Sequence, residues 1–291
     1  MAKKSHKQIV LAQNFLRSSK LVRLLLNTSS IGSCDIVYEI GSGRGIITAE
    51  LARIAYKVIA IEKDPFLAQQ LLKRFQDVDN VEIIANDFLQ YHIPDREYKI
   101  FANIPYNITA DIVRKILYTP PVPGEAYLVL QKEAAEKFSG SPSETQFSIL
   151  AKPLFNLQII RELRRTDFEP VPKVDSVLLH IKKRHSLLVH EQDTFLYRSF
   201  VRYGFGSWKK SLKLIFKPIF TYEQWRRLSK DLHFPLDATP TELTLEQWLG
   251  LFDCFKLRVP GNKQACLKSG LWTIFAPHLV VEFTFWPFLS V

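Results

Sequence analysis

A glycine-rich loop and two carboxylates mark the ends of three successive predicted strands. The loop reads EIGSGRG over residues 39–45, Glu62 closes the second strand, and Asp87 follows the third. Glycines let a nucleotide-bearing ligand approach the backbone at the carboxyl edge of a parallel sheet. At that edge Glu39 could meet a cationic group, Glu62 could accept hydrogen bonds from ribose hydroxyls, and Asp87 could accept one from an adenine amino group. The alternative is a loop of glycines with surface carboxylates, which does not explain their common edge.

The tetrapeptide Asn103-Ile104-Pro105-Tyr106 follows the fourth predicted strand and fits methylation of an adenine amino group. Adenine N6 is a poor nucleophile, because its lone pair is delocalised into the ring. Hydrogen bonds from N6–H to the Asn103 side-chain carbonyl and the Ile104 main-chain carbonyl would favour the nucleophilic form. Pro105 fixes φ, and Tyr106 offers a face on which an extruded base can stack. An NAD oxidoreductase shares the glycine loop and an acidic residue about 20 positions later, but the tetrapeptide favours the methyltransferase.

Two further segments each allow two interpretations. Gln13-Asn14-Phe15-Leu16 could fold as a lid over one end of the cofactor, or it could begin an N-terminal helix. Phe168 opens a segment that Pro170 and Pro172 make rigid. Its ring could sandwich the target base opposite Tyr106, or it could be a core phenylalanine beside a proline turn.

Apolar runs and helix-period segments alternate through the first two thirds of the chain, which predicts a parallel sheet wrapped by helices. The predicted strands are Ile36–Ile40, Val58–Glu62, Val81–Ala85, Lys99–Ala102 and Ala126–Leu130, with helices over Thr48–Ala55, Phe66–Phe75 and Asp111–Tyr118. Two later runs, Leu157–Leu163 and Val174–Ile181, predict an antiparallel hairpin at the sheet edge. From about residue 190 short amphipathic helices predict a small helical domain, with helices over Phe195–Tyr203, Glu223–Ser229 and Leu245–Phe252.

Basic residues are concentrated in two segments. The formal net charge is +10; residues 1–34 hold six Lys or Arg and no Asp or Glu, and residues 182–230 hold twelve against three. Clustered cations favour a polyanionic partner, because each phosphate contact releases condensed counterions. A solvated basic face is the other interpretation that charge alone leaves open.

The remaining composition indicates no metal centre and no targeting segment. The three cysteines lie far apart without a CxxC pair, which predicts neither a metal site nor a disulfide framework. The N-terminus lacks an apolar signal region, so we expect a cytoplasmic protein. The apolar stretch over residues 270–291 is interrupted by prolines and polar residues, which argues against a membrane-spanning helix.

In this order the motifs resemble those of the ribosomal RNA adenine N6-dimethyltransferase family, over roughly residues 5 to 256. NIPYNITADIVRKI over residues 103–116 and the EIGSGRG loop look more like the Erm branch than the KsgA branch, as do FVRYGFGSWKKSL and TPTELTLEQWLGLF. The resemblance implies an α/β fold, a Rossmann-like class I methyltransferase domain over residues 1–188 with a seven-stranded, mostly parallel sheet. A small all-helical RNA-binding domain would follow over residues 189–260, and a tail of unknown role over residues 261–291.

The resemblance also implies an activity and the residues that carry it. Methyl groups would pass from S-adenosylmethionine, as co-substrate, to N6 of one adenine in 23S rRNA, with resistance to macrolide, lincosamide and streptogramin B antibiotics as the result. The implied cofactor-binding residues are Asn14, Leu16, Gly41, Glu62, Asp87 and Asn103, with Asn103 and Tyr106 at the target base and Phe168 supporting it. The expected partner is nascent or unassembled 23S rRNA, without a metal or a membrane, and the expected form is a monomer.

Three alternatives stay open at this point. A KsgA-like enzyme would dimethylate adenine in 16S rRNA, and a non-catalytic factor on the same fold would bind nucleic acid only. The intact segment 103–106 argues against the second. A DNA adenine methyltransferase is disfavoured, because such enzymes usually carry a second proline where this chain has Ile104.

Overall fold

The chain divides into two compact units. The computed structural model describes residues 14–207, 211–261, 264 and 267, so most of the predicted tail 261–291 lies outside the described residues. The first unit takes its described residues from Met1–Pro142 and Ala151–Ser186, and the second from Ser143–Leu150 and Leu187–Val291.

Residues 143–150 belong to the second unit, although they lie inside the predicted domain 1–188. They carry most of helix α7 (Gln146–Ala151). Ile149 is fully buried in the hydrophobic core of the second unit, and its carbonyl accepts a hydrogen bond of 2.9 Å from the Tyr197 hydroxyl. Burial of this apolar side chain among the later helices assigns the segment to them.

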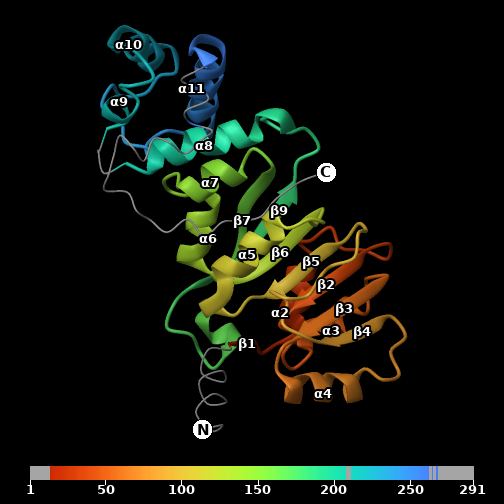
Figure 1. The fold of residues 1–291 in the computed structure, drawn as a ribbon. Helices are drawn as coiled ribbons and strands as arrows, with labels where there is room; N and C mark the ends of the chain where they lie inside the picture. Colours follow the sequence, from red (N-terminus) through yellow and green to blue (C-terminus); the bar gives the residue numbers. More distant parts are fainter. Residues whose placement is uncertain (1–13, 208–210, 262–263, 265–266, 268–291) are drawn as a thin grey trace, which may run out of the picture. The chain divides into compact units, whose positions relative to one another are not determined.

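The first unit is built on a mixed, mostly parallel sheet of seven strands, as predicted (Figure 1). The strands are β2 (Ile36–Ile40), β3 (Lys57–Glu62), β4 (Val81–Ala85), β5 (Lys99–Asn103), β6 (Glu125–Gln131), β7 (Phe155–Leu163) and β9 (Ser176–Lys183). Their order in the sheet is β4-β3-β2-β5-β6-β9-β7. β-Branched and aliphatic residues fill the inner strands, which are buried on both faces.

Parallel pairing brings the carboxyl ends of β2 to β5 to one edge of the sheet. Ile40 of β2 pairs with Ile61 of β3, and Glu62 of β3 pairs with Ala85 of β4. These three strands therefore end next to one another. The glycine loop, Glu62 and the segment after Asn103 therefore start from neighbouring points. Ligands of open α/β sheets bind at this edge.

The predicted hairpin is confirmed at the other side of the sheet. Strand β9 lies between β6 and β7 and is antiparallel to both, and β7 forms the edge. The strand begins at Ser176 instead of Val174, because Asp175 still belongs to the loop. The Asp175 carboxylate is paired with Arg165 at 2.7 Å. The main-chain carbonyl of Asp175 accepts a hydrogen bond from the Lys132 amide.

Helices of the first unit begin at recognisable caps. The helices and 3₁₀ turns are α2 (Ser19–Leu26), α3 (Ile46–Leu51), α4 (Pro65–Arg74), η1 (Tyr106–Ile108), α5 (Thr109–Tyr118), α6 (Lys132–Ser139) and η2 (Arg165–Asp167). Asp64 caps α4 by accepting from two backbone N–H groups, and Pro65 occupies the first turn. The predicted helices are confirmed as α3, α4 and α5 with shifted ends, whereas α2 and α6 were not predicted.

A two-stranded ribbon joins the N-terminal segment to the loop before β9. Strand β1 (Phe15–Leu16) pairs antiparallel with β8 (Phe168–Glu169), and Leu16 lies opposite Phe168. Both side chains are buried in a core that also contains Val22 of α2 and Ile47 of α3. The ribbon is thus attached to the sheet through apolar contacts, and it places the residue before it, Asn14, near the end of β5.

The second unit is an all-helical cluster with an aromatic core. Its elements are η3 (Glu191–Asp193), α8 (Thr194–Phe205), α9 (Leu212–Ile215), α10 (Tyr222–Asp231) and α11 (Leu245–Arg258), together with most of α7. Phe200 is fully buried and stacks on Phe216 with ring centroids 4.8 Å apart. Capping boxes begin α10 at Thr221 and α11 at Thr244. Three of these helices match the predicted ones, and α11 runs six residues further than predicted.

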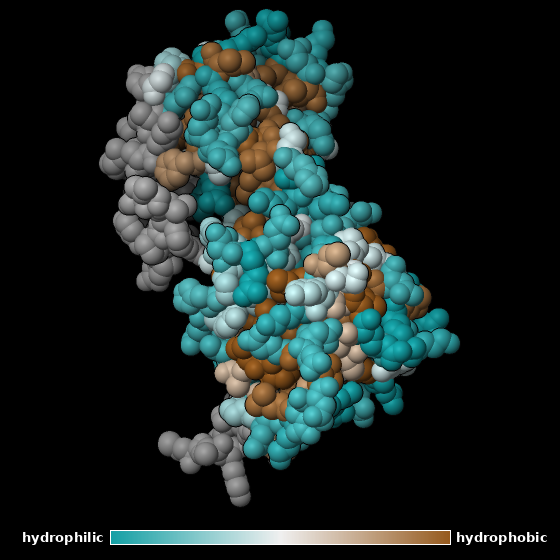
Figure 2. All heavy atoms as spheres, turned by 90° about the vertical axis from the view of Figure 1, so that its right-hand side faces the viewer, coloured by the Kyte–Doolittle hydropathy of each residue, from teal (hydrophilic) through white to brown (hydrophobic). Residues whose placement is uncertain are grey.

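On the face shown in Figure 2, hydrophilic residues cover most of the area and hydrophobic residues show between them. Among the described residues no helix is long and apolar enough to cross a membrane. The same residues contain no group of three or more His, Cys, Asp or Glu side chains that could hold a metal ion.

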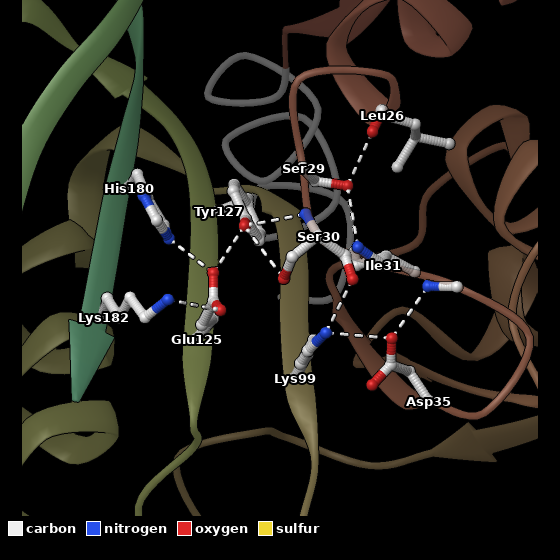
Figure 3. A network of polar contacts seen from close by, with 11 residues as sticks. Leu26, Ser29, Ser30, Ile31, Asp35, Lys99, Glu125, Tyr127, His180 and Lys182 are labelled. Atoms are coloured by element: carbon white, nitrogen blue, oxygen red, sulfur yellow. Dashed lines mark hydrogen bonds and ion pairs between the residues drawn. The ribbon is translucent and has the colours of Figure 1, made fainter. Parts of the chain in front are cut away.

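A polar network ties the amino ends of β5 and β6 to the loop before β2 (Figure 3). Lys99 pairs with Asp35 at 2.9 Å, and the Tyr127 hydroxyl accepts from the Ser30 amide and donates to Glu125. Burial would raise the pKa of Glu125, but hydrogen bonds from Tyr127 and His180 outweigh it and lower the pKa to about 2. This edge is closed by charge-balanced contacts, which leaves the opposite edge for chemistry.

Candidate active site

A cavity of about 450 Å³ lies at the carboxyl edge of the sheet in the first unit. Its walls come from the N-terminal segment, the glycine loop, the ends of β3 and β4, and the segment after β5. Six residues predicted for the site line it: Asn14, Gly41, Glu62, Asp87, Asn103 and Tyr106. Residues as far apart in the sequence as Asn14 and Tyr106 therefore share one cavity, because strands β2 to β5 end together and the β1–β8 ribbon brings Asn14 to their ends.

The structure does not bring Leu16 and Phe168 to this cavity. Their side chains are 4% and 0% exposed and belong to the hydrophobic core beneath the β1–β8 ribbon. Pairing of the two strands places them opposite each other, so each covers the other's apolar surface. Phe168 was expected to stack on a base opposite Tyr106. In this structure its ring is buried, so neither face is free to contact a base.

The glycine loop approaches the N-terminal segment closely. Gly41 and Gly43 have φ of 69° and 53°, a left-handed conformation that other residues rarely adopt. A Cβ atom at Gly43 would lie 2.6 Å from the Phe15 ring, which also lines the cavity. The Arg44 guanidinium lies over the same ring, 4.9 Å from its centroid. Glycine at position 43 is therefore required for Asn14 and Phe15 to close over the loop.

Glu62 is held in place by main-chain donors. Its Oε2 accepts from the Gly43 amide at 2.7 Å, and its Oε1 accepts from the Asp64 amide at 2.8 Å. Burial raises the pKa of Glu62 above its ordinary value, and these two hydrogen bonds oppose the rise. Each oxygen keeps a second acceptor position, so two adjacent hydroxyl groups can bind and compensate the buried charge.

Asp87 lies beside a cation at the far end of the cavity. Its Oδ2 is 2.6 Å from Lys63 Nζ, and its Oδ1 accepts from the Leu89 amide at 3.0 Å. Burial acts to raise the pKa of Asp87, but the hydrogen bonds from Lys63 and Leu89 outweigh it and lower the pKa. Asp87 is therefore an ionised acceptor, suited to an amino group of a ligand.

In the Asn103 side-chain amide, the nitrogen has a hydrogen-bond partner and the oxygen has none among the described residues. Its Nδ2 donates to the Asn14 carbonyl at 2.6 Å, which fixes the amide orientation, because a carbonyl can only accept. Its Oδ1 is buried and has no hydrogen-bond partner among the described residues. The next residue is also held, since the Ile104 amide donates to the Val129 carbonyl at 2.9 Å. The strand end thus presents a fixed acceptor to a ligand N–H.

Tyr106 follows at the start of the 3₁₀ turn η1. Its hydroxyl lies 2.6 Å from Ser176 Oγ at the start of β9. Burial raises the pKa of the phenol, so it remains neutral. The half-buried ring lines the cavity and offers an aromatic surface to a planar ligand.

The structure does not bring Glu39 to the cavity, where a contact with a cationic group was expected. Its side chain is 1% exposed, and its Oε2 accepts from the Thr48 hydroxyl at 2.5 Å. Burial, with the nearby Glu62, raises the pKa of Glu39 to about 8. A largely protonated Glu39 joins β2 to α3 and supports the glycine loop from behind.

Comparison with known proteins shows the family of this chain. The family model described as ribosomal RNA adenine dimethylase matches residues 4–256. The chain belongs to this family. An rRNA adenine N-6-methyltransferase of Bacteroides fragilis is 31% identical over 243 residues, which are 82% of this chain and 90% of the relative.

Members with different named targets are similar to this chain. A ribosomal RNA small subunit methyltransferase A of Acaryochloris marina is 29% identical, over 83% of this chain and 94% of its own length. The crystal structure of the 23S rRNA methyltransferase ErmE superimposes with a TM-score of 0.78 at 29% identity, covering 84% of this chain and all of that one.

Several residues at the site of this family member were missed from the sequence. Lys63, Asp64 and Phe88 line the cavity, and Ser176 contacts Tyr106. Asp64 carried a usable signal, because an Asp before a Pro after a strand marks a helix start. The others carried none, since their role depends on neighbours distant in sequence.

We expect Glu39 to make stability depend on pH. Between the ordinary pKa of a glutamate and about 8, the folded state holds a proton that the unfolded state has released, so stability falls as pH rises through this range. Glu39→Gln keeps the neutral acceptor for Thr48 and removes the titration. Urea unfolding of the whole protein is measured at pH 6 and pH 9. The loss of stability between the two pH values should be smaller for the variant than for the unaltered protein. Equal losses in both proteins would contradict the assignment.

Proposed function

We propose that this protein transfers methyl groups from S-adenosylmethionine to N6 of a specific adenine in 23S rRNA and thereby confers macrolide, lincosamide and streptogramin B resistance. The observation that carries the proposal is the Asn103 amide, whose Nδ2 is bonded to Asn14 while its buried Oδ1 has no partner in the described chain. A buried acceptor without a partner costs about 1–3 kcal/mol. An N–H donor from a ligand removes that cost.

The cavity fits S-adenosylmethionine. Glu62 would accept hydrogen bonds from the ribose hydroxyls, Asp87 would accept one from the adenine amino group, and Gly41 leaves room for the chain that carries the sulfonium. Asn14 and Phe15 would cover the ligand. When bound, S-adenosylmethionine supplies an electrophilic methyl group, and the remaining chemistry falls to the protein and the RNA base.

The protein residues would activate and hold the base. Asn103 Oδ1 and the Ile104 carbonyl would accept hydrogen bonds from N6–H, which shifts the nitrogen lone pair out of conjugation and towards the methyl group. Tyr106 would stack on the extruded adenine and keep N6 in line. Methyl transfer leaves a positive charge on N6, which makes its proton acidic enough to be lost to solvent water; a strong base is not required, and Asn103 does not accept the proton.

Two observations support 23S rRNA as the target. Residues 103–116 and the loop over 39–45 resemble the Erm branch, and ErmE, titled a 23S rRNA methyltransferase, has a TM-score of 0.78 to this chain. The second candidate is the small-subunit rRNA, which the 29% identity to the Acaryochloris marina enzyme favours.

RNA phosphates would be held by the basic segments. Arg17 and Lys20 are exposed in the first unit, and Arg226 and Lys230 are exposed on α10 in the second. Lys209 and Lys210 lie outside the described residues. A cytoplasmic location and a monomeric form are part of the same proposal, since both suit an enzyme of unassembled rRNA.

Asn103→Ala should lower kcat for methyl transfer by roughly 100-fold, because the acceptor for N6–H is lost in the transition state. Transfer of labelled methyl groups to purified rRNA measures the effect. Asn156→Ala is the matched control, because Asn156 is exposed on β7 of the same unit. Full activity of Asn103→Ala would sink the mechanism.

Primer extension should locate the modified base. We expect a stop at one adenine of 23S rRNA from cells that express the protein, together with reduced macrolide susceptibility. A stop confined to 16S rRNA would identify the small-subunit target instead. No stop on either RNA, without labelled-methyl transfer, would indicate a non-catalytic binding factor.

Replacing Arg226 and Lys230 together by Glu should weaken RNA binding and reduce the slope of log K against log salt by about 1 to 2, the loss expected for two phosphate contacts. Binding titrations at several salt concentrations measure the slope. Lys73→Glu on α4, outside both basic segments, is the control. An unchanged slope for the double variant would place the RNA elsewhere.

A further inference from the structure

The Tyr106 ring needs a restraint that its own turn does not supply. The backbone at Tyr106 is held by η1, where the Ile108 amide and the Thr109 hydroxyl both donate to the Pro105 carbonyl at 3.2 Å. These bonds fix the main chain only. The side chain can still rotate about χ1, and such a rotation would carry the ring out of the cavity.

Ser176 is placed to stop this rotation. It is the first residue of β9 and is 2% exposed. On one side it pairs with Gln131 of β6, and on the other with Leu163 of β7, so its backbone is flanked by strands on both sides. The sheet therefore fixes the Ser176 backbone, and its short, buried side chain places the hydroxyl 2.6 Å from that of Tyr106.

The bond between the two hydroxyls acts on one torsion. The phenol oxygen lies on the axis of the Tyr106 ring, so a hydrogen bond of 2.6 Å to Ser176 fixes the direction of the ring and leaves rotation about that axis free. Stacking needs this fixed direction, because it keeps the ring in the cavity, next to the site of the base. The free rotation lets the face adjust to the plane of a base.

We propose that Ser176 is a positioning residue for the methyl transfer, which holds the Tyr106 ring in the direction that stacks on the target adenine. This inference rests on the proposed function. Ser176 itself touches neither the base nor the methyl donor in this account; it acts through the Tyr106 hydroxyl alone.

Two consequences separate this role from a general structural one. Loss of the bond leaves Glu62, Asp87 and the glycine loop intact, so the KM for S-adenosylmethionine should not change while kcat falls. Because each hydroxyl has its effect only through the other, the effects of Ser176→Ala and Tyr106→Phe should not add.

The test is a double-mutant cycle in methyl transfer to 23S rRNA, with Ser176→Ala, Tyr106→Phe and the double variant. One buried hydrogen bond corresponds to a fall in kcat of about fivefold. We expect that fall in each single variant, no further fall in the double variant, and an unchanged KM for S-adenosylmethionine. Ser139→Ala is the control, because Ser139 is also a buried serine of the first unit and its hydroxyl contacts the Glu136 carbonyl instead.

The outcomes are distinct from those that test the proposed function. If the unaltered protein transfers methyl groups but Ser176→Ala is as active as Ser139→Ala, the positioning role is wrong. A fall for Ser176→Ala that persists in the Tyr106→Phe background would also overturn it, since Ser176 would then act elsewhere. Absence of transfer by the unaltered protein to any rRNA would overturn the proposed function, and the positioning role with it.

Discussion

Parallel strand pairing is the constraint on which the site depends. Because β2 to β5 run in one direction, the residues that follow these four strands start from a single edge, and four short motifs from separate parts of the sequence line one cavity. None of the motifs forms a site alone. The glycine loop offers space, Glu62 and Asp87 offer acceptors, and Asn103 offers a fixed carbonyl. At the opposite edge Lys99 is paired with Asp35, and Glu125 accepts a hydrogen bond from Tyr127.

The sequence predicted those strands and helices that have a clear local pattern of apolar and polar residues. Strands β2 and β4 agree with the predicted ranges residue for residue, because each is a short, largely apolar run between turn residues; β2 is buried inside the sheet, and β4 is a partly exposed edge strand. Helix α6 was missed because it is short and mostly polar. Only Ala135, Phe138 and Ser139 are buried, so its sequence has no clear apolar face. Its existence depends on the strands it covers more than on its own sequence.

The site was predictable only where position in the chain determines position in space. Strand-end residues such as Glu62 are placed by topology, so the sequence was enough to bring them together. Leu16 and Phe168 are placed by pairing across 150 residues of chain, which no local pattern reveals. The resemblance implied a site role for both residues; burial beneath the ribbon matches the other interpretation of Phe168, a core phenylalanine beside a proline turn. Ser176 is the reverse case, a residue without a motif that lies beside the aromatic ring of the site.

The path of the chain between the two units limits how the protein can be divided. The chain leaves the first unit after Pro142, contributes α7 to the second, returns at Ala151, and leaves again after Ser186. A truncation at the end of β9 would strip Ile149 of its core and expose an apolar helix on the remaining piece. Exchange of the helical unit between relatives by a single crossover would create the same mismatch. A single cut in the chain therefore cannot separate the two units, although each has its own core.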